Sequence, residues 1–149
     1  MSGTIERFAP EHLFEADWTG EPMARAVGCD LGLEEVGQKY AENGIGLTAR
    51  YKGKVIACMG VVKLWGGVGE VWCFTAQDAQ AHPRLLCRAA LWGIDAGMKT
   101  LGLHRVQAHV DADFEAGLRW ARYLRLEFEG PCSKYTADGR DVVRFARVK

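Results

Sequence analysis

Apolar residues recur along the chain with two periods, one typical of helices and one typical of strands. Residues 83–100 place Leu86, Ala90 and Ile94 at helical spacing, which predicts an amphipathic helix. Residues 105–110 instead alternate apolar and polar side chains, as in a strand with one buried face. The same periods, separated by turn residues, predict further strands at 4–8, 46–51, 54–64, 68–75, 128–135 and 142–148, and further helices at 10–17, 33–41 and 113–124.

These elements follow the order β-α-α-β-β-β-α-β-α-β-β. A run of antiparallel strands followed by a right-handed strand-helix-strand crossover gives a mixed, mostly antiparallel sheet with helices on both faces. The predicted fold class is therefore α/β, of the α+β kind. The sequence contains no internal repeat and no linker-like stretch, so residues 1–149 are expected to form a single domain.

Composition and charge narrow the class of protein. The longest apolar run, residues 55–62, is far shorter than the roughly 20 residues that span a bilayer, and residues 1–7 lack a secretory signal pattern. We therefore expect a cytoplasmic protein that does not bind membranes. The 19 basic and 19 acidic residues balance, which argues against nucleic-acid binding. Residues 76–149 still carry three more basic than acidic residues. This excess indicates either charges scattered over a solvated surface or a site for a small anion.

The five cysteines are scattered along the chain, and no two of them are closer than 14 residues. This spacing fits neither a disulfide framework nor a zinc site. We expect no metal site and interpret the cysteines mainly as small apolar residues of the core.

Two stretches in the second half of the chain resemble one family. Residues 117–130 read GLRWARYLRLEFEG, which is similar to the fourth helix of the GNAT N-acetyltransferases and the Leu-Gly-Phe and Glu-Gly pattern that follows it. Residues 134–147 resemble the closing hairpin of the same family. The resemblance covers residues 71–148, and it implies the GNAT fold with coenzyme A as cofactor and acetyl-CoA as acyl donor.

In this family the pyrophosphate of coenzyme A binds at the loop entering the third helix, through a Gln/Arg-x-x-Gly-x-Gly/Ala pattern. Gln77 matches the first position here, but Gln80 and His82 occupy the two glycine positions. Arg84 and Arg88, one turn apart, either bind phosphate directly or belong to a solvated helix face; for His82, helix capping or exposure to solvent is the alternative. The preceding strand would supply backbone groups for the rest of the cofactor. The expected cofactor-binding residues are Phe74, Thr75, Gln77, Gln80, His82, Arg84 and Arg88.

Acetyl transfer also needs a base for the amine and an acid for the leaving thiolate. Glu70, at the start of a central strand, and His109, near the end of its neighbour, are the best-placed bases. Tyr135 is the candidate acid. For each of the three, a structural or surface role is the alternative.

Two positions depart from the pattern of the family. Phe114 stands where a frequent Asn is expected, and Ala121 where a frequent general-acid Tyr is expected. Tyr123 cannot replace that Tyr, because two residues rotate a side chain by about 200° around a helix. These departures weaken the catalytic interpretation without excluding it.

Three functions are consistent with these features. The first is an acetyl-CoA-dependent N-acetyltransferase for a small-molecule or peptide amine, with a homodimer expected from the family. The second is a non-catalytic protein, since the chain also resembles GNAT-like virion and accessory proteins of tailed phages. The third is a module that binds acyl-CoA without turning it over. Trp18, in the irregular stretch 18–31, would contact the acceptor or anchor its own loop.

Overall fold

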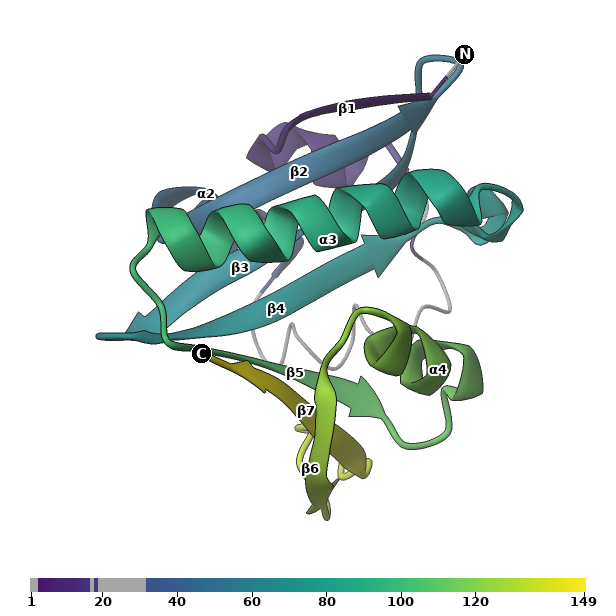
Figure 1. Ribbon diagram of the computed structural model, residues 1–149. Coiled ribbons are helices and arrows are strands. Elements are labelled where there is room, and N and C mark those ends of the chain that lie inside the picture. Colours follow the sequence, from purple (N-terminus) through teal and green to yellow (C-terminus); the bar gives the residue numbers. More distant parts are fainter. Residues whose placement is uncertain (1–2, 17, 19–31) are drawn as a thin grey trace.

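The computed structural model of the protein describes residues 3–16, 18 and 32–149. Within these residues, seven strands form one sheet in the order β1-β2-β3-β4-β5-β7-β6 (Figure 1). The strands are β1 (Gly3–Arg7), β2 (Gly44–Tyr51), β3 (Lys54–Trp65), β4 (Val68–Thr75), β5 (Arg105–Asp111), β6 (Glu127–Cys132) and β7 (Val142–Val148). The helices are α2 (Leu33–Glu42), α3 (Pro83–Thr100) and α4 (Glu115–Tyr123), together with the 3₁₀ helices η1 (Pro10–Phe14) and η2 (Gln77–Ala81).

The sheet changes from antiparallel to parallel pairing at its centre. Strands β1 to β4 pair antiparallel, and a tight turn with positive φ at Lys52 and Gly53 joins β2 to β3. Helix α3 then carries the chain across the sheet to β5, which pairs parallel with β4 only from Val68 to Glu70. Strands β7 and β6 continue the sheet antiparallel. Beyond Glu70, β4 and β5 therefore separate, as the two diverging arrows in Figure 1 show.

Two apolar cores lie on the two faces of this sheet. Helices α3 and α4 cover one face, where Ile94 and Met98 belong to the same buried cluster as Val106 of β5. Helices η1 and α2 cover the other face, where Tyr40 stacks on the fully buried Trp72 with 4.4 Å between ring centroids. In Figure 1, α3 lies in front of the sheet and α2 behind it. The predicted fold class and order of elements are therefore confirmed, with the 3₁₀ helix η1 as the first predicted helix.

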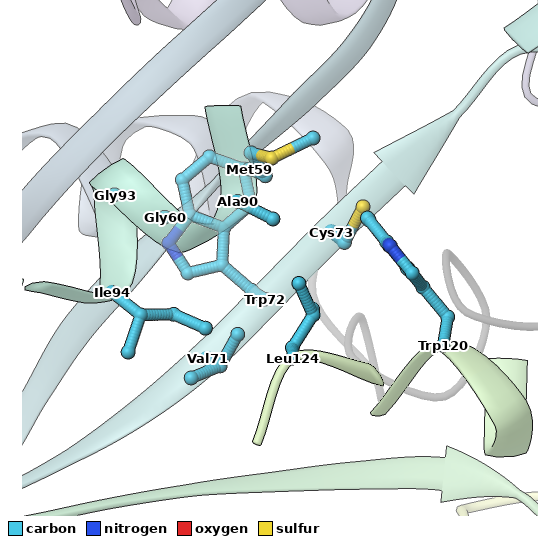
Figure 2. Close-up of a pocket in the computed structure, with 10 residues that line it drawn as sticks. All are labelled: Met59, Gly60, Val71, Trp72, Cys73, Ala90, Gly93, Ile94, Trp120 and Leu124. Atoms are coloured by element: carbon cyan, nitrogen blue, oxygen red, sulfur yellow. The ribbon is translucent and has the colours of Figure 1, made fainter. Parts of the chain in front are cut away.

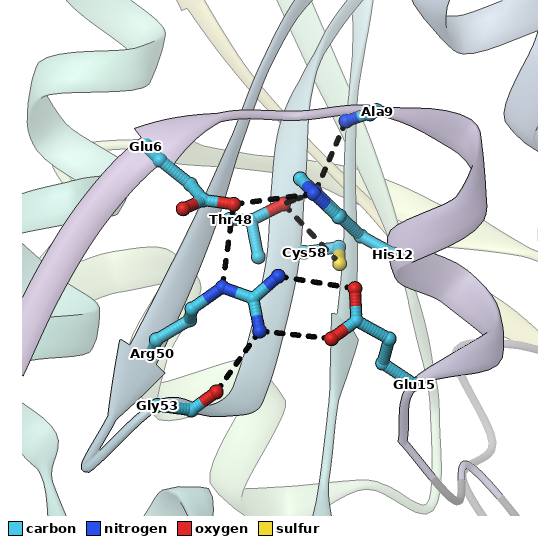
Figure 3. Close-up of polar contacts among 8 residues, drawn as sticks. All are labelled: Glu6, Ala9, His12, Glu15, Thr48, Arg50, Gly53 and Cys58. Carbon is cyan, nitrogen blue, oxygen red and sulfur yellow. Dashed lines mark hydrogen bonds and ion pairs between the residues drawn. The ribbon is translucent and has the colours of Figure 1, made fainter.

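A polar network holds the N-terminal segment against the sheet (Figure 3). Arg50 of β2 donates two hydrogen bonds to Glu15, with N···O distances of 2.9 and 3.0 Å, and a third to Glu6. The buried ring of His12 lies beside them, with Nδ1 2.8 Å from Thr48 Oγ1 and Nε2 3.1 Å from Glu6 Oε1. These contacts join β1 and η1 to β2, on the face that η1 and α2 cover.

The start of helix α4 differs from the prediction. Asp113 does not cap it, because it lies one residue before the N-cap position, and its backbone N–H donates to Asp111 Oδ1 at 3.1 Å. Phe114 is the N-cap residue, and its side chain makes no capping hydrogen bond. The helix begins at Glu115, two residues later than predicted.

The strand predicted at 128–135 also ends early. Strand β6 stops at Cys132, and Tyr135 lies in the turn that leads to β7. The backbone N–H of Tyr135 donates to Arg140 O at 2.9 Å, and Lys134 N–H donates to Asp141 Oδ1 at 2.8 Å. These bonds close the turn on itself, so its backbone donors no longer extend the ladder between β6 and β7.

Candidate functional site: a cavity beside the splayed strands

The separation of β4 from β5 opens a cavity of about 430 Å³ on the face that α3 and α4 cover. Its walls include Val71, Cys73 and Thr75 of β4, Ala108 and Val110 of β5, Pro83, Leu86 and Cys87 of α3, Gly117, Trp120 and Ala121 of α4, and Leu124 just after α4. Gln80 and Arg119 add polar groups to these mostly apolar walls. Such a lining suits a long, mainly apolar ligand with an anionic end.

Alternation along β4 decides which side chains reach the cavity. Val71, Cys73 and Thr75 line it, whereas Phe74 packs in the core beneath η1 and α2 and is only 1% exposed. The side chain of Phe74 therefore does not reach this cavity, so its predicted cofactor contact would be made by its backbone. Thr75, the other strand residue predicted for that role, does lie in the wall.

A second, smaller chamber of about 30 Å³ adjoins the cavity beneath α3. Figure 2 shows Trp120 of α4 and the C-cap residue Leu124 on one side of it and Ile94 of α3 on the other. Val71 and Cys73 line both spaces. The chamber is lined mainly by apolar groups, so it suits a small apolar group.

The loop expected to bind pyrophosphate folds as the 3₁₀ helix η2, which occupies part of its backbone donors. The N–H of His82 donates to Ala79 O at 2.9 Å. The ring of His82 stacks on Tyr51, with 3.9 Å between centroids, and does not line the cavity. Of the loop positions predicted to bind the cofactor, Gln80 alone lies in the cavity wall. Since side chains fill both glycine positions, this loop does not form an open backbone cradle.

Three other predicted contacts lie outside the cavity wall: Gln77, Arg84 and Arg88 are exposed on η2 and α3. Pro83 occupies the first helical position and has no N–H, so the free backbone donors of α3 begin one residue later. Arg119 of α4 does line the cavity, and the sequence analysis missed it. Nothing in the sequence distinguishes Arg119 from an arginine on a solvated helix face.

The two departures from the family pattern both lie in the cavity wall. Phe114 and Ala121 replace polar groups with an aromatic ring and a methyl group there. Tyr123 points away and is 66% exposed, as the helical rotation predicted. The cavity therefore carries no tyrosine acid on α4.

The three predicted catalytic residues come together on the opposite face of the sheet. Glu70 Oε2 lies 2.7 Å from His109 Nδ1. The ring of Tyr135 stacks on the His109 ring, with centroids 4.5 Å apart and planes 15° apart. The side chain of His109 is buried, that of Glu70 is one-fifth exposed and that of Tyr135 is about half exposed. Their roles stay predictions, but their proximity is a property of the fold.

Arg144 of β7 completes this group, and the sequence analysis did not single it out. It pairs with His109 across the β5–β7 ladder, and its Nε donates to His109 Nε2 at 3.0 Å. Further along the same face, Arg105 forms two hydrogen bonds with Glu129, at 2.8 and 2.5 Å. The Glu129 carboxylate keeps a lowered pKa, mainly through the hydrogen bond from Arg105. The alternation of β5 places these charged groups together and keeps them off the cavity face.

The position of Glu70 connects the two faces. It is the last residue of β4 that pairs with β5, so it lies where the strands begin to separate. The next residue, Val71, already lines the cavity. The Glu70 carboxylate on one face and the cavity on the other therefore both border the gap between β4 and β5.

Trp18 acts as an anchor in this structure. Its side chain is 8% exposed, and its Nε1 donates to Leu13 O at 2.7 Å. It also packs against Phe74, with ring centroids 5.8 Å apart. Of the two alternatives for Trp18, the structure favours the anchor; the other residues of the stretch 18–31 lie outside the described part of the chain.

The described residues contain no group of three or more His, Cys, Asp or Glu side chains arranged to hold a metal ion. None of the helices in the same part of the chain has the length and apolar character to cross a bilayer. Four of the five cysteines are described, and these four are free, two of them buried.

Comparison by sequence gives no match, either to a protein-family model or to a curated protein. Comparison by structure gives many similar folds. The protein yncA from Salmonella typhimurium, a candidate acetyltransferase solved with its cofactor acetyl-CoA, has a TM-score of 0.79 at 12% identity over 99% of this chain and 94% of its own.

Two other acetyltransferases are similar over nearly their whole length. A variant of the spermidine N-acetyltransferase SpeG from Vibrio cholerae has a TM-score of 0.74 at 13% identity, covering 99% of this chain and 94% of its own. The ribosomal-protein-S5-alanine acetyltransferase from Vibrio fischeri has a TM-score of 0.72 at 14% identity, covering 99% and 93%. The chain therefore has the GNAT fold, as the resemblance of residues 71–148 implied.

Proposed function

We propose that this protein is an acetyl-CoA-dependent N-acetyltransferase that acts on an amine. One observation carries the proposal: the large cavity and the carboxylate of Glu70 both border the gap where β4 separates from β5. Similar folds solved with acetyl-CoA or described as N-acetyltransferases support it. One of these proteins is named as a spermidine N-acetyltransferase and another as a ribosomal-protein-S5-alanine acetyltransferase. The proposal therefore covers both small-molecule amines and peptide amines.

The lining of the cavity suits the apolar and anionic parts of coenzyme A. Its apolar walls on β4 and α4 would pack against the pantetheine arm, and Thr75 offers a hydroxyl beside that arm. At the other end, Gln80 and the guanidinium of Arg119 would take the place of the missing glycine loop and bind phosphate oxygens. When bound, acetyl-CoA supplies a thioester whose carbonyl carbon is open to attack by an amine.

The acceptor would approach from the face that carries Glu70, His109 and Tyr135. A carboxylate there takes a proton from the ammonium form of the acceptor, which frees the nitrogen lone pair. The C–N bond then forms as the C–S bond breaks, and the leaving thiolate takes up a proton. Tyr135, half exposed beside His109, is the phenol that would supply that proton.

The first experiment measures binding. Calorimetric titration with acetyl-CoA and with coenzyme A should give saturable binding, followed by thiol release when small-molecule and peptide amines are added in turn. The absence of binding at millimolar acetyl-CoA would contradict the proposal.

A second candidate function is a non-catalytic GNAT-like protein, including the phage-type proteins that the chain resembles. Three observations favour it: side chains fill both glycine positions of the loop, Phe114 replaces a polar group, and Ala121 replaces the usual acid. Acetyl-CoA binding without product from any amine would support an acyl-CoA-binding module. The absence of both would support a protein that does not use the cavity for coenzyme A.

A location in the cytoplasm and a homodimer formed through the last strands belong to the same proposal. Phe128 of the edge strand β6 is 56% exposed, and Val148 at the end of β7 is 63% exposed. Light scattering on the purified protein tests the dimer. A monomer mass at all concentrations would contradict it.

A further inference from the structure

The hydrogen bond from Arg144 determines which nitrogen of His109 carries a proton. Arg144 Nε is a donor and has no lone pair to offer, so His109 Nε2 must accept at 3.0 Å. A nitrogen that accepts a hydrogen bond is unprotonated. The His109 ring is therefore neutral, because in a charged imidazolium both nitrogens are donors.

The proton of the neutral ring then sits on Nδ1, which faces Glu70. His109 Nδ1–H donates to Glu70 Oε2 at 2.7 Å. His109 is only 7% exposed, and the ring of Tyr135 covers one of its faces, so water has little access to rearrange these bonds. The order of donation runs from Arg144 to His109 and from His109 to Glu70.

We propose that Arg144 is a positioning residue that locks His109 in the neutral Nδ1–H tautomer, and that Glu70 is consequently the proton acceptor of the site. The Nε2 lone pair is occupied by Arg144, and Nδ1 is protonated, so His109 has no free site for a proton from the amine. Glu70 keeps its second oxygen, Oε1, which accepts no hydrogen bond from the described residues. The tautomer stands on geometry alone, whereas the assignment of the base rests on the proposed acetyltransferase function.

Charged groups from each neighbouring strand face this array. Glu70 comes from β4, Arg105 from β5, Glu129 from β6 and Arg144 from β7. Glu129 lowers the net positive charge around the ring, since it interacts electrostatically with Arg105 and Arg144. The array therefore contains two carboxylates and two guanidinium groups around a neutral imidazole.

The test is the tautomer of His109, read by long-range ¹H–¹⁵N correlation on protein labelled with ¹⁵N-histidine. The spectrum of H109Q assigns the signals among the four histidines. In the wild-type protein we expect Nδ1 to appear protonated and Nε2 unprotonated. In R144M, Nε2 loses its donor while Glu70 still accepts from Nδ1–H, so we expect a proton on both nitrogens, that is, an imidazolium. R144K should restore the neutral Nδ1–H tautomer because its ammonium can donate to Nε2.

Arg147 provides a matched control on the same strand. It lies on the other face of the sheet, where it contacts Asp95 of α3. R147M should leave the His109 signals unchanged. A protonated Nε2 in the wild-type protein, or an R144M spectrum identical to that of the wild type, would overturn the proposal.

The base assignment has its own readout once an acceptor amine is known. E70Q should lower kcat by roughly 100- to 10,000-fold. H109Q should lower it less, because the glutamine amide can still donate to Glu70. A larger loss in H109Q than in E70Q would overturn the assignment of Glu70. The tautomer measurement uses neither acetyl-CoA nor an amine, so failure of the proposed function leaves its result intact.

Discussion

Trp120 of α4 donates a hydrogen bond from its indole Nε1 to the Sγ of Cys87 of α3, over 3.4 Å. Both residues line the cavity beside β4, so this contact closes the wall where the two helices meet. It also places a thiol at the surface that a bound ligand would cover. Cys132, at the end of β6, is equally free but lies outside the cavity lining.

Acetyl-CoA is therefore expected to protect Cys87 from alkylation. At a ligand concentration ten times the Kd, labelling of Cys87 by iodoacetamide should slow about tenfold, because the free protein falls to about a tenth. Labelling of Cys132 should not change. Cys58 should stay unmodified in either condition, because burial raises the pKa of its thiol to about 12. Mass spectrometry of the digested protein measures all three; equal protection of Cys87 and Cys132 would argue against binding in this cavity.

Arg119 is expected to contribute to cofactor affinity through the phosphates. R119Q should weaken coenzyme A binding by up to about tenfold, since a hydrogen bond to a charged group contributes about 1.5 kcal/mol at the low end of its range. The exposed position of Arg119 keeps the effect at that end. Pantetheine, which lacks the pyrophosphate, should bind R119Q and wild type equally. K99Q, at the far end of α3, is the control.

Filling the cavity from α4 should abolish binding while preserving the fold. Ala121 is 5% exposed and lines the cavity, so A121F would place a ring in the space for the pantetheine arm. We expect more than a tenfold loss of acetyl-CoA affinity by calorimetry. The cost in Tm should be small, because the added ring enters open volume. Y123F, on the exposed side of the same helix, should bind like the wild type; unchanged affinity in A121F would place the ligand elsewhere.

The ion pair between Arg50 and Glu15 should make stability depend on pH. The hydrogen bond from Arg50 holds the pKa of Glu15 below its usual value of 4.5. A carboxylate with a lowered pKa in the folded state stabilises the protein above its unfolded pKa, and this contribution disappears as the pH falls through the folded pKa. E15Q should therefore have a lower Tm than the wild type near neutral pH.

The two melting curves should converge as the medium is acidified below the pKa of an ordinary carboxylate. Thermal unfolding followed by circular dichroism over a pH series measures this. E11Q, an exposed glutamate on the same 3₁₀ helix η1, is the control and should follow the wild type throughout. A constant difference between E15Q and wild type at every pH would contradict the role assigned to the ion pair.

The elements of this fold follow closely from local patterns in the sequence. Helix α3 spans the predicted residues 83–100, because an apolar stripe at helical spacing forms a helix wherever a sheet face is available to cover. Strand β5 likewise keeps its predicted alternation, with Val106 in the core and His109 on the other face. Tyr135 was wrongly assigned to a strand, because the side-chain bonds that close its turn come from residues up to seven positions away.

The site was only partly predictable. Glu70, His109 and Tyr135 were each predicted separately, because the sequence does not show the hydrogen bond that joins Glu70 to His109. Arg119 and Arg144 were missed because a charged residue on a helix or strand looks the same in sequence whether it faces water or a site. The loop at 77–82 was predicted to bind phosphate because it occupies the place of the family's phosphate-binding loop. Residues 77–81 instead form a 3₁₀ helix, in which backbone N–H groups such as that of His82 donate to carbonyls of the same loop.

The sequence by itself determined the order of the elements, which face of each is apolar, and the loss of both loop glycines, since these depend on residue type and on spacing within a few turns. The tertiary structure decided that β4 and β5 separate after Glu70, that the cavity opens toward α4, and that Arg144 reaches His109. Those features depend on the register between strands far apart in the chain. Register is set by the packing of the whole sheet between its two layers of helices, which no local pattern records.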